Sequence, residues 1–285
     1  MAELAESVEE LRQDRTHGGS WLARRAVEAL LGVVEEPAAS TDELLGRLLD
    51  AGRELAAARP AHGAVASAVG RLVASGHAAS HLPAAELRRL LSEEANALIA
   101  GRDRAAASIA VHLAPRLRDA TVLTHSFSAT VREAVLHGSP ARVLCTVSAP
   151  FEEGRRLADE LRAEGAKAEL VEDGRVPEAL EAASLVLVGA DTVYEDGSFT
   201  NKIGTGPLAQ GAHAAGVSVL VACELLKLAP GPPPKVEQEP DLRDLTPASL
   251  VDAIVTEEGP CAPEEVLTLI DRTPFLREGR RLLFG

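Results

Sequence analysis

The first 115 residues carry apolar side chains at the spacing of helices. The leucines of residues 44–55 form an apolar stripe, and the preceding Ser-Thr-Asp-Glu of residues 40–43 fits a helix capping box. Residues 61–75 predict another helix, and residues 83–113 predict a long one that ends before Pro115. No strand-like run occurs in this part of the sequence, which therefore predicts a helical bundle.

From Ala120 onward the period of the pattern changes. Short apolar runs predict strands at residues 121–124, 142–147, 167–171, 185–188 and 217–222, with a last one at 250–256. Strands that alternate with helices indicate right-handed β-α-β units and a parallel sheet. The predicted fold class is therefore α/β. We expect an N-terminal all-helical domain, residues 1–117, followed by a domain of residues 118–285 with a parallel β-sheet flanked by helices.

The composition fits a globular protein with a sizeable core. Of the 285 residues, 46% are apolar and 2% aromatic, so the core is expected to consist of Leu, Val and Ala. No apolar run approaches the roughly 18 residues that a membrane span needs. The N-terminal segment is acidic and polar and has no secretion signal. We therefore expect a cytoplasmic protein that has no membrane partner.

Charge and cysteine usage narrow the classes of partner. A net charge of −14 repels phosphate backbones, so direct nucleic-acid binding is not expected. Cys145, Cys223 and Cys261 have no short-spaced neighbours, which argues against a disulfide framework and a structural zinc site. No metal or other cofactor is predicted.

Polar residues gather where the predicted strands end. Thr124-His125-Ser126 follows the first strand, Asp191 the fourth, and residues 224–227 the fifth. Ligands of open α/β sheets bind beyond these carboxyl ends. A turn-rich link then leads to Asn201 and Lys202, and the helix that we expect from Pro207 offers its N-terminus to an anion. Because a dinucleotide fingerprint and a phosphate loop are both lacking, a phosphate or sugar phosphate is the better candidate.

Lysine usage points to the same stretch. Of 29 basic residues, four are lysines, and two of them, Lys202 and Lys227, lie here. An ammonium is not interchangeable with a guanidinium, so these two positions are candidates for a specific need for lysine. The alternative is that both are surface lysines left by chance.

These residues also resemble the signature of one superfamily. The Gly-Ala-Asp of residues 189–191, the Asn-Lys-Ile-Gly-Thr of residues 201–205 and the Glu-Leu-Leu-Lys of residues 224–227 form a long and specific motif. It looks like the motif of the alpha, beta and delta regulatory subunits of translation initiation factor 2B, methylthioribose-1-phosphate isomerase and archaeal ribose-1,5-bisphosphate isomerase. Weaker matches at Gly18-Gly19 and in the C-terminal segment extend the resemblance over most of the chain.

The resemblance implies a helical N-terminal domain and a Rossmann-like C-terminal domain through which family members dimerise. In the isomerases, a cysteine after the first Rossmann strand works with the Asp of Gly-Ala-Asp. Asp191 matches the Asp, but Ser126 stands at the cysteine position. A thiol titrates near 8.5 and can be tuned toward neutrality, whereas a serine hydroxyl is a poor acid or base. From the residues alone, Ser126 could instead cap the following helix, and Asp191 could cap a turn.

Two functions stay open at this point. The first is an initiation factor 2B-like protein that binds a sugar phosphate or nucleotide monophosphate without efficient catalysis. The second is an aldose–ketose isomerase of the ribose 1,5-bisphosphate type that uses Asp191. A homodimer or larger homo-oligomer is expected, and a translation factor is a further candidate partner. The candidate catalytic residues are Asp191 and Ser126, and the candidate ligand-binding residues are Gly18, Gly19, Thr124, His125, Ser128, Asn201, Lys202, Gly204, Thr205 and Lys227.

Overall fold

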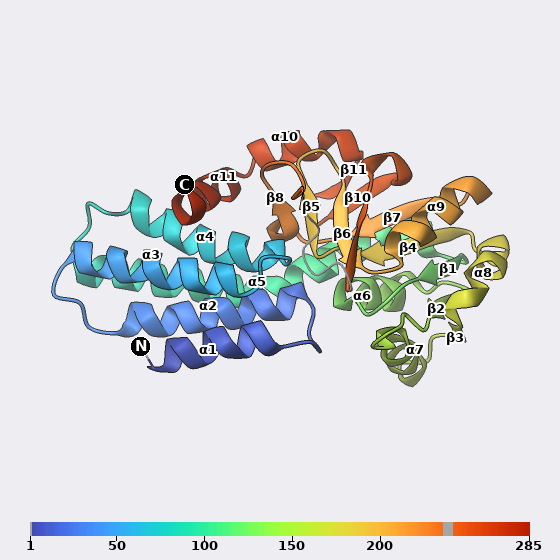
Figure 1. The fold of residues 1–285 in the computed structure, drawn as a ribbon, viewed down its shortest axis with the longest axis horizontal. Helices are drawn as coiled ribbons and strands as arrows, with labels where there is room; N and C mark the ends of the chain where they lie inside the picture. Colours follow the sequence, from blue (N-terminus) through green and yellow to red (C-terminus); the bar gives the residue numbers. More distant parts are fainter. Residues whose placement is uncertain (1, 236–241) are drawn as a thin grey trace. The chain divides into compact units, whose positions relative to one another are not determined.

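The computed structural model describes residues 2–235 and 242–285 (Figure 1). The chain forms two compact units. The first comprises residues 1–102, 226–230 and 268–285, and the second comprises residues 103–225 and 231–267. Within the described ranges, no helix has the length and apolar character needed to cross a membrane.

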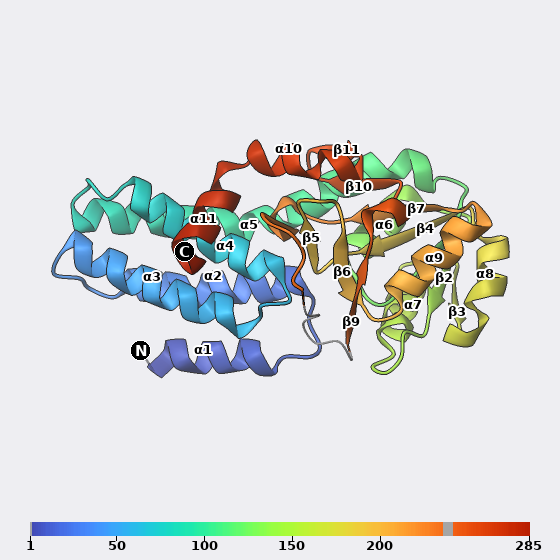
Figure 2. The ribbon, with the colours of Figure 1, turned by 45° about the horizontal axis from the view of Figure 1, so that its top comes forward.

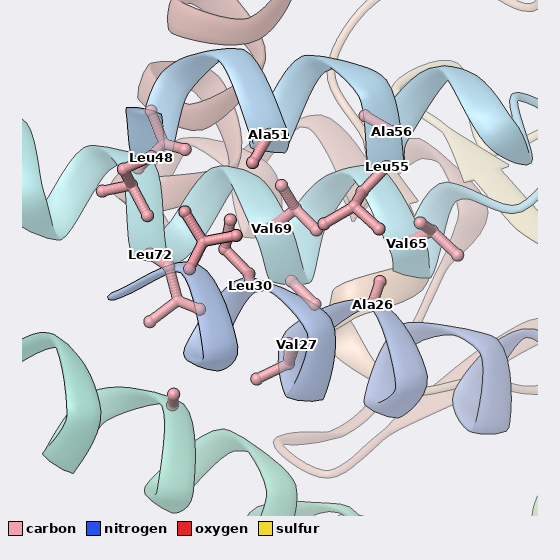
Figure 3. Packing of buried hydrophobic residues seen from close by; sticks show 14 of the residues in the cluster. Ala26, Val27, Leu30, Leu48, Ala51, Leu55, Ala56, Val65, Val69 and Leu72 are labelled. Atoms are coloured by element: carbon pink, nitrogen blue, oxygen red, sulfur yellow. The ribbon is translucent and has the colours of Figure 1, made fainter. Parts of the chain in front are cut away.

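The first unit is helical, as the sequence predicts. Its helices are α1 (Ala2–Gln13), α2 (Gly19–Glu35), α3 (Thr41–Ala58), α4 (Gly63–Ala78) and α11 (Pro274–Phe284), together with the first part of α5 (Ala84–Leu117). Aliphatic side chains of α2, α3 and α4 interleave to form its core, as Figure 3 shows for Leu30, Leu55 and Val69. The Ser40 hydroxyl accepts a 3.1 Å hydrogen bond from the Glu43 amide, which confirms the predicted cap of α3.

The C-terminal helix α11 belongs to this helical unit. It crosses α4 at Gly70 and Gly279, where a Cβ added to Gly279 would lie 2.6 Å from the Gly70 carbonyl carbon. Residues 268–285 therefore join the first unit, whereas the predicted boundary assigned them to the second domain. The predicted end of the long helix before Pro115 is wrong, because α5 continues to Leu117. Pro115 lies in the last turn of α5. A proline there removes one backbone hydrogen bond near the helix end, and the helix can continue for two more residues.

The second unit is built on a seven-stranded sheet in the order β11-β10-β7-β4-β1-β2-β3. All neighbouring strands are parallel except β10 and β11. The predicted strands are all present, and their bounds are β1 (Thr121–Thr124), β2 (Arg142–Thr146), β3 (Ala168–Val171), β4 (Leu185–Gly189), β7 (Ser218–Ala222) and β10 (Ala253–Thr256), with β11 (Gly259–Cys261) added at the edge. The central strand β4 is apolar and buried throughout because both faces of a parallel sheet are covered there.

Helices cover the sheet as the β-α-β connections require. The end of α5, α6 (Ala129–Gly138) and α7 (Glu153–Ala163) share one apolar cluster with β1 and β2. The helices α8 (Val176–Ala182) and α9 (Thr205–Ala215) lie side by side (Figure 2), and a Cβ on Gly211 would approach Leu180 to 2.9 Å. The remaining short elements are η1 (Asp173–Arg175), η2 (Leu225–Lys227), β8 (Leu228–Ala229), η3 (Ala248–Leu250), η4 (Pro263–Glu265) and α10 (Val266–Asp271).

One part of the sequence prediction is wrong. The link expected between Asp191 and Asn201 is a hairpin of β5 (Thr192–Tyr194) and β6 (Phe199–Lys202), which continues into antiparallel pairing with β9 (Arg243–Thr246). Asn201 and Lys202 therefore lie on a strand, and Lys202 is in register with Arg243. These strands are short and partly polar, so the pattern that reveals buried parallel strands does not reveal them.

Candidate functional site

The winding of the large sheet reverses between β1 and β4. Strands β2 and β3 follow β1 on one side, and β7 and β10 follow β4 on the other, so the carboxyl ends of β1 and β4 form the topological switch point. His125 and Ser126 directly follow β1, and Asp191 lies two residues beyond β4. The structure thus brings the predicted strand-end residues of the second unit to one edge of its sheet.

His125 is fully engaged within the second unit. Its Nε2 lies 2.8 Å from the Ile203 carbonyl oxygen, which can only accept, so Nε2 carries the proton. Its Nδ1 therefore accepts from the Thr146 hydroxyl at 2.7 Å. Burial lowers the pKa of His125, although the hydrogen bond to Ile203 opposes this shift. The imidazole is a neutral structural link, with neither nitrogen left for a substrate proton.

Ser126 is a half-buried turn residue. Its φ is +65°, a conformation that costs a non-glycine residue free energy. Its amide donates to the Ser148 hydroxyl at 2.7 Å, and its own hydroxyl has no hydrogen-bond partner among the residues that the structure describes. The alternative that Ser126 caps α6 is wrong, because Ser128 is the cap and accepts from the Val131 amide at 3.3 Å. Thr124 is buried, and its hydroxyl oxygen also has no described partner.

Asp191 forms an ion pair that the sequence did not suggest. The Arg243 Nε lies 2.7 Å from Asp191 Oδ2, and the two side chains are only 12% and 15% exposed, respectively. Arg243 comes from β9, which is far away in the sequence. The alternative that Asp191 caps a turn does not account for this contact. Its charge is matched by the guanidinium before any ligand arrives.

Lys202 also has an internal partner. Its Nζ lies 3.0 Å from Glu153 Oε1 and 4.7 Å from the centroid of the Phe151 ring. The Lys202 side chain is 8% exposed, which excludes the reading that it is a surface lysine. The side-chain amide of the neighbouring Asn201 donates to the Thr205 hydroxyl at 3.1 Å, and that hydroxyl donates to the Lys202 backbone carbonyl at 2.6 Å. Asn201 and Thr205 thus shape the turn that leads into α9.

The N-terminus of α9 is occupied by a side chain. The amides of Gly204 and Gly206 donate to the two carboxylate oxygens of Asp244 at 2.7 and 3.1 Å. An anion is therefore already bound where the sequence suggested a phosphate. Gly204 has a φ of +100°, and a Cβ there would lie 3.0 Å from the His125 ring. This position needs glycine for both its backbone and its packing.

A cavity of about 920 Å³ opens beside these residues in the second unit. His125, Ile203 and Gly204 form part of its wall, and the rest is mostly aliphatic side chains of α8 and α9. Its charged lining groups are the carboxylates of Asp173 and Glu181, and its lining contains no Lys or Arg. Two negative charges and no basic side chain make it a poor phosphate pocket.

The nearest thiol cannot take the place of the missing cysteine. Cys145 on β2 is in register with Thr124 on β1, but its side chain belongs to the apolar cluster on one face of the sheet. Burial raises the pKa of Cys145 to about 12, so it remains a thiol at neutral pH. It provides no acid or base for the isomerase chemistry.

The first unit holds a second group of predicted residues. Gly19 begins α2, and a Cβ there would lie 3.3 Å from His62 Nδ1 and 3.9 Å from Lys227 Cε. Arg59 donates to His62 Nε2 at 2.8 Å, so that imidazole is neutral. Gly18 precedes α2 as its N-cap residue and makes no side-chain cap, and the first turn of the helix contains no acidic residue.

Lys227 differs from every other charged group described above. It is 5% exposed, and it makes no hydrogen bond or ion pair with any residue that the structure describes. A buried ammonium without a partner is unfavourable unless an anion completes it. The first unit therefore places an unmatched cation beside a helix N-terminus that has no side-chain cap, and this combination suits a phosphate group.

The sequence analysis named the candidate site residues but not the residues that contact them. Glu153, Arg243, Asp244 and His62 each contact a predicted residue, but none belongs to the motifs that the sequence displays. The contacts of Glu153, Arg243 and Asp244 join positions about 40 to 50 residues apart, and local patterns cannot reveal them. Each unit thus carries its own group of candidate residues.

The architecture indicates the class of protein. The chain combines a helical unit with a doubly wound, mostly parallel α/β unit that has polar residues at its switch point. The initiation factor 2 subunit family matches residues 15–243, so the chain belongs to that family.

Named relatives carry two different functions. The chain is 32% identical over 278 residues to a translation initiation factor eIF-2B subunit 2-like protein of Pyrococcus abyssi, covering 91% of this chain and 96% of the relative. It is 29% identical over 298 residues to ribose 1,5-bisphosphate isomerase of Haloferax volcanii, covering 94% and 91%. The predicted family resemblance is thereby confirmed, with both the factor-like and isomerase branches represented.

A solved structure confirms the fold. The tetrameric eIF2B-beta2-delta2 complex from C. thermophilum superposes with a TM-score of 0.83 at 22% identity, covering 94% of this chain and 93% of that one. The α/β class with an N-terminal helical part is therefore the observed fold.

Proposed function

We propose that this protein binds a sugar phosphate or nucleotide monophosphate and has no efficient isomerase activity. The observation that carries this proposal is Lys227, a lysine that is 5% exposed and has no partner among the described residues, beside Gly19 at the N-terminus of α2. Gly19 lacks a side chain where a ligand oxygen could approach the helix amides. A phosphate would supply the charge that Lys227 lacks.

The residues at the switch point support a binding role rather than catalysis. Ser126 stands where the isomerases have cysteine, and a hydroxyl is a poor acid or base at neutral pH. Asp191 is ion-paired with Arg243, and His125 uses both ring nitrogens internally. A proton moved between two sugar carbons needs a group that can release and accept it, and these three side chains offer none that is ready to do so.

The test combines a thermal shift with product detection. The purified protein is incubated with ribose 1,5-bisphosphate or ribose 5-phosphate, and unfolding and ketose formation are both followed. We expect stabilisation without product. If a ketose forms and Asp191→Asn abolishes it, the non-enzymatic proposal fails. If neither ligand stabilises the protein, the proposal of phosphate binding fails.

A variant at Lys227 tests the site itself. Lys227→Met keeps an unbranched side chain of slightly shorter length and removes the charge, so the unliganded protein should unfold at a higher temperature while the shift caused by ribose 5-phosphate disappears. Lys167→Met is the matched control, because Lys167 is exposed, and it should change neither value. A Lys227 variant that still responds fully to the ligand would contradict the proposed site.

The isomerase remains the second candidate for one specific reason. Asp191 is retained, and a relative that aligns over 94% of the chain is named ribose 1,5-bisphosphate isomerase. In that case Asp191 would have to exchange its bond to Arg243 for one to the substrate. Product formation in the assay above decides between the two candidates.

We also propose that the protein works as an oligomer. The structural relative from C. thermophilum is a tetramer of two kinds of subunit, and a dimer or larger assembly of this chain would follow the same pattern. A translation factor is a candidate partner on the same basis. Light scattering of the purified chain tests the self-association, and a mass that stays at 29.8 kDa would exclude it.

A further inference from the structure

The Glu153–Lys202 pair lies within the second unit and has an unusual asymmetry. Lys202 sits on β6, which pairs with β5 on one side and β9 on the other, and its side chain is 8% exposed. Glu153 is the first residue of α7, and its side chain is 26% exposed. The lysine is therefore the more buried member of the pair, whereas the Glu153 side chain is partly exposed.

The Glu153 carboxylate is only partly satisfied where it is. Oε1 contacts Lys202 at 3.0 Å, but Oε2 is buried and has no hydrogen-bond partner in the described part of the chain. A carboxylate oxygen buried without a donor costs free energy. Moving Glu153 into water removes this cost and offsets part of the free energy lost when the ion pair with Lys202 breaks. Phe151, which lies against the ammonium, is 51% exposed and leaves this side of the pair close to the surface.

We propose that Glu153 is a built-in competitor for the phosphate of a ligand at Lys202. This inference rests on the proposed function for the class of ligand, a phosphate ester, and it concerns a second phosphate position, in the second unit, besides the one proposed at Lys227 in the first. In the unliganded protein, the carboxylate supplies the negative charge that Lys202 requires. A phosphate ester can bind there only when Glu153 turns outward, and the pair thereby lowers the affinity for anions and favours ligands whose other contacts offset the exchange.

Glu153→Gln is the direct test, because it removes the competing charge and nearly keeps the shape. In the Lys227→Met background, which removes the position proposed in the first unit, titration calorimetry should show that Glu153→Gln increases the affinity for ribose 5-phosphate roughly tenfold, since like charges held close together in a partly buried site repel strongly. The unliganded variant should unfold at a slightly lower temperature, because Lys202 loses its counter-charge, and the ligand should restore that loss.

Matched variants separate this effect from a general change of charge. Glu152→Gln makes the same change one residue away, at a side chain that pairs with Arg155 instead, and should leave affinity unchanged. Adding Lys202→Gln to Glu153→Gln should remove the gained affinity. These two results, together with the tenfold gain, would support the proposal.

Two other outcomes would overturn it and differ in what they mean. If the wild type binds ribose 5-phosphate but Glu153→Gln brings no gain in affinity in the Lys227→Met background, Glu153 is not a competitor, and the proposed function stands. If neither the wild type nor Glu153→Gln binds the ligand, an uncovered Lys202 attracts no phosphate, and the proposed function fails as well.

Discussion

Gly204 offers the sharpest test of the geometry around His125. It precedes α9 with a φ of +100°, and a Cβ there would lie 3.0 Å from both Cε1 and Nε2 of His125. Gly204→Ala therefore has two costs. Holding an L-residue in the left-handed region costs about 1–2 kcal/mol. The new methyl group must also displace the imidazole ring.

The ring has little freedom to move aside. Thr146 and Ile203 hold its two nitrogens at 2.7 and 2.8 Å, so a displacement of a few tenths of an ångström weakens at least one of these bonds. Losing one buried hydrogen bond costs about 1 kcal/mol. The total expected for Gly204→Ala is roughly 2–3 kcal/mol, most of it felt in α9 and the segment after β1.

The chain provides a matched control at the other end of α9. Gly216 follows the helix with a φ of +69°, and a Cβ there would meet no atom within 4 Å. Gly216→Ala should therefore carry the backbone cost alone, about 1–2 kcal/mol. The difference between the two variants isolates the contact with His125.

Hydrogen exchange of the α9 amides, together with urea unfolding, measures both effects. The opening free energy of residues 205–215 should fall by about 1 kcal/mol more in Gly204→Ala than in Gly216→Ala, which is the cost of the weakened His125 hydrogen bond. Adding His125→Ala should remove most of this excess, because the smaller side chain leaves room for the methyl group. Equal losses in the two glycine variants would refute the close packing of His125 against this turn.

Two further predictions concern charge. Arg243→Gln should destabilise the protein by about 2 kcal/mol in urea unfolding, less than the 3–5 typical of a fully buried pair, because Arg243 and Asp191 retain some exposure. The double variant with Asp191→Asn should cost less than the sum of the two singles, and simple additivity would refute the pairing. The lowered pKa of His125 means that the unfolded chain binds its proton first, so the stability advantage of the wild type over His125→Gln should be constant above about pH 6.5 and shrink as the pH falls below it.

The sequence predicted the parts of the fold that local patterns encode. Parallel strands are buried on both faces and read as apolar runs, which is why β1 and β4 were found with nearly correct bounds. The antiparallel strands β5, β6 and β9 were missed because they are short, partly polar and held by pairing between distant segments. The local sequence also did not settle which serine caps α6, because Ser126 and Ser128 both precede the helix and the cap is Ser128.

The candidate site was predicted in its residue types but not in its pairings. Position along the sequence indicated that Asp191 and Lys202 would lie at strand ends. It could not indicate that Arg243 and Glu153 would neutralise them, because those contacts depend on how β9 and α7 pack. A prediction of free charges at a strand end therefore needs the tertiary structure before it becomes a prediction of binding.

The overall negative charge of the chain makes the lack of a partner for Lys227 among the described residues informative. With 43 acidic residues against 29 basic ones, most cations should find a carboxylate nearby, as Lys202 and Arg243 do. Lys227 is buried and, among the described residues, has none. Chance placement would favour a partner in so acidic a chain, and selection for stability alone would favour an apolar side chain at a buried position. The proposed phosphate ligand would supply the negative charge that Lys227 lacks among the described residues.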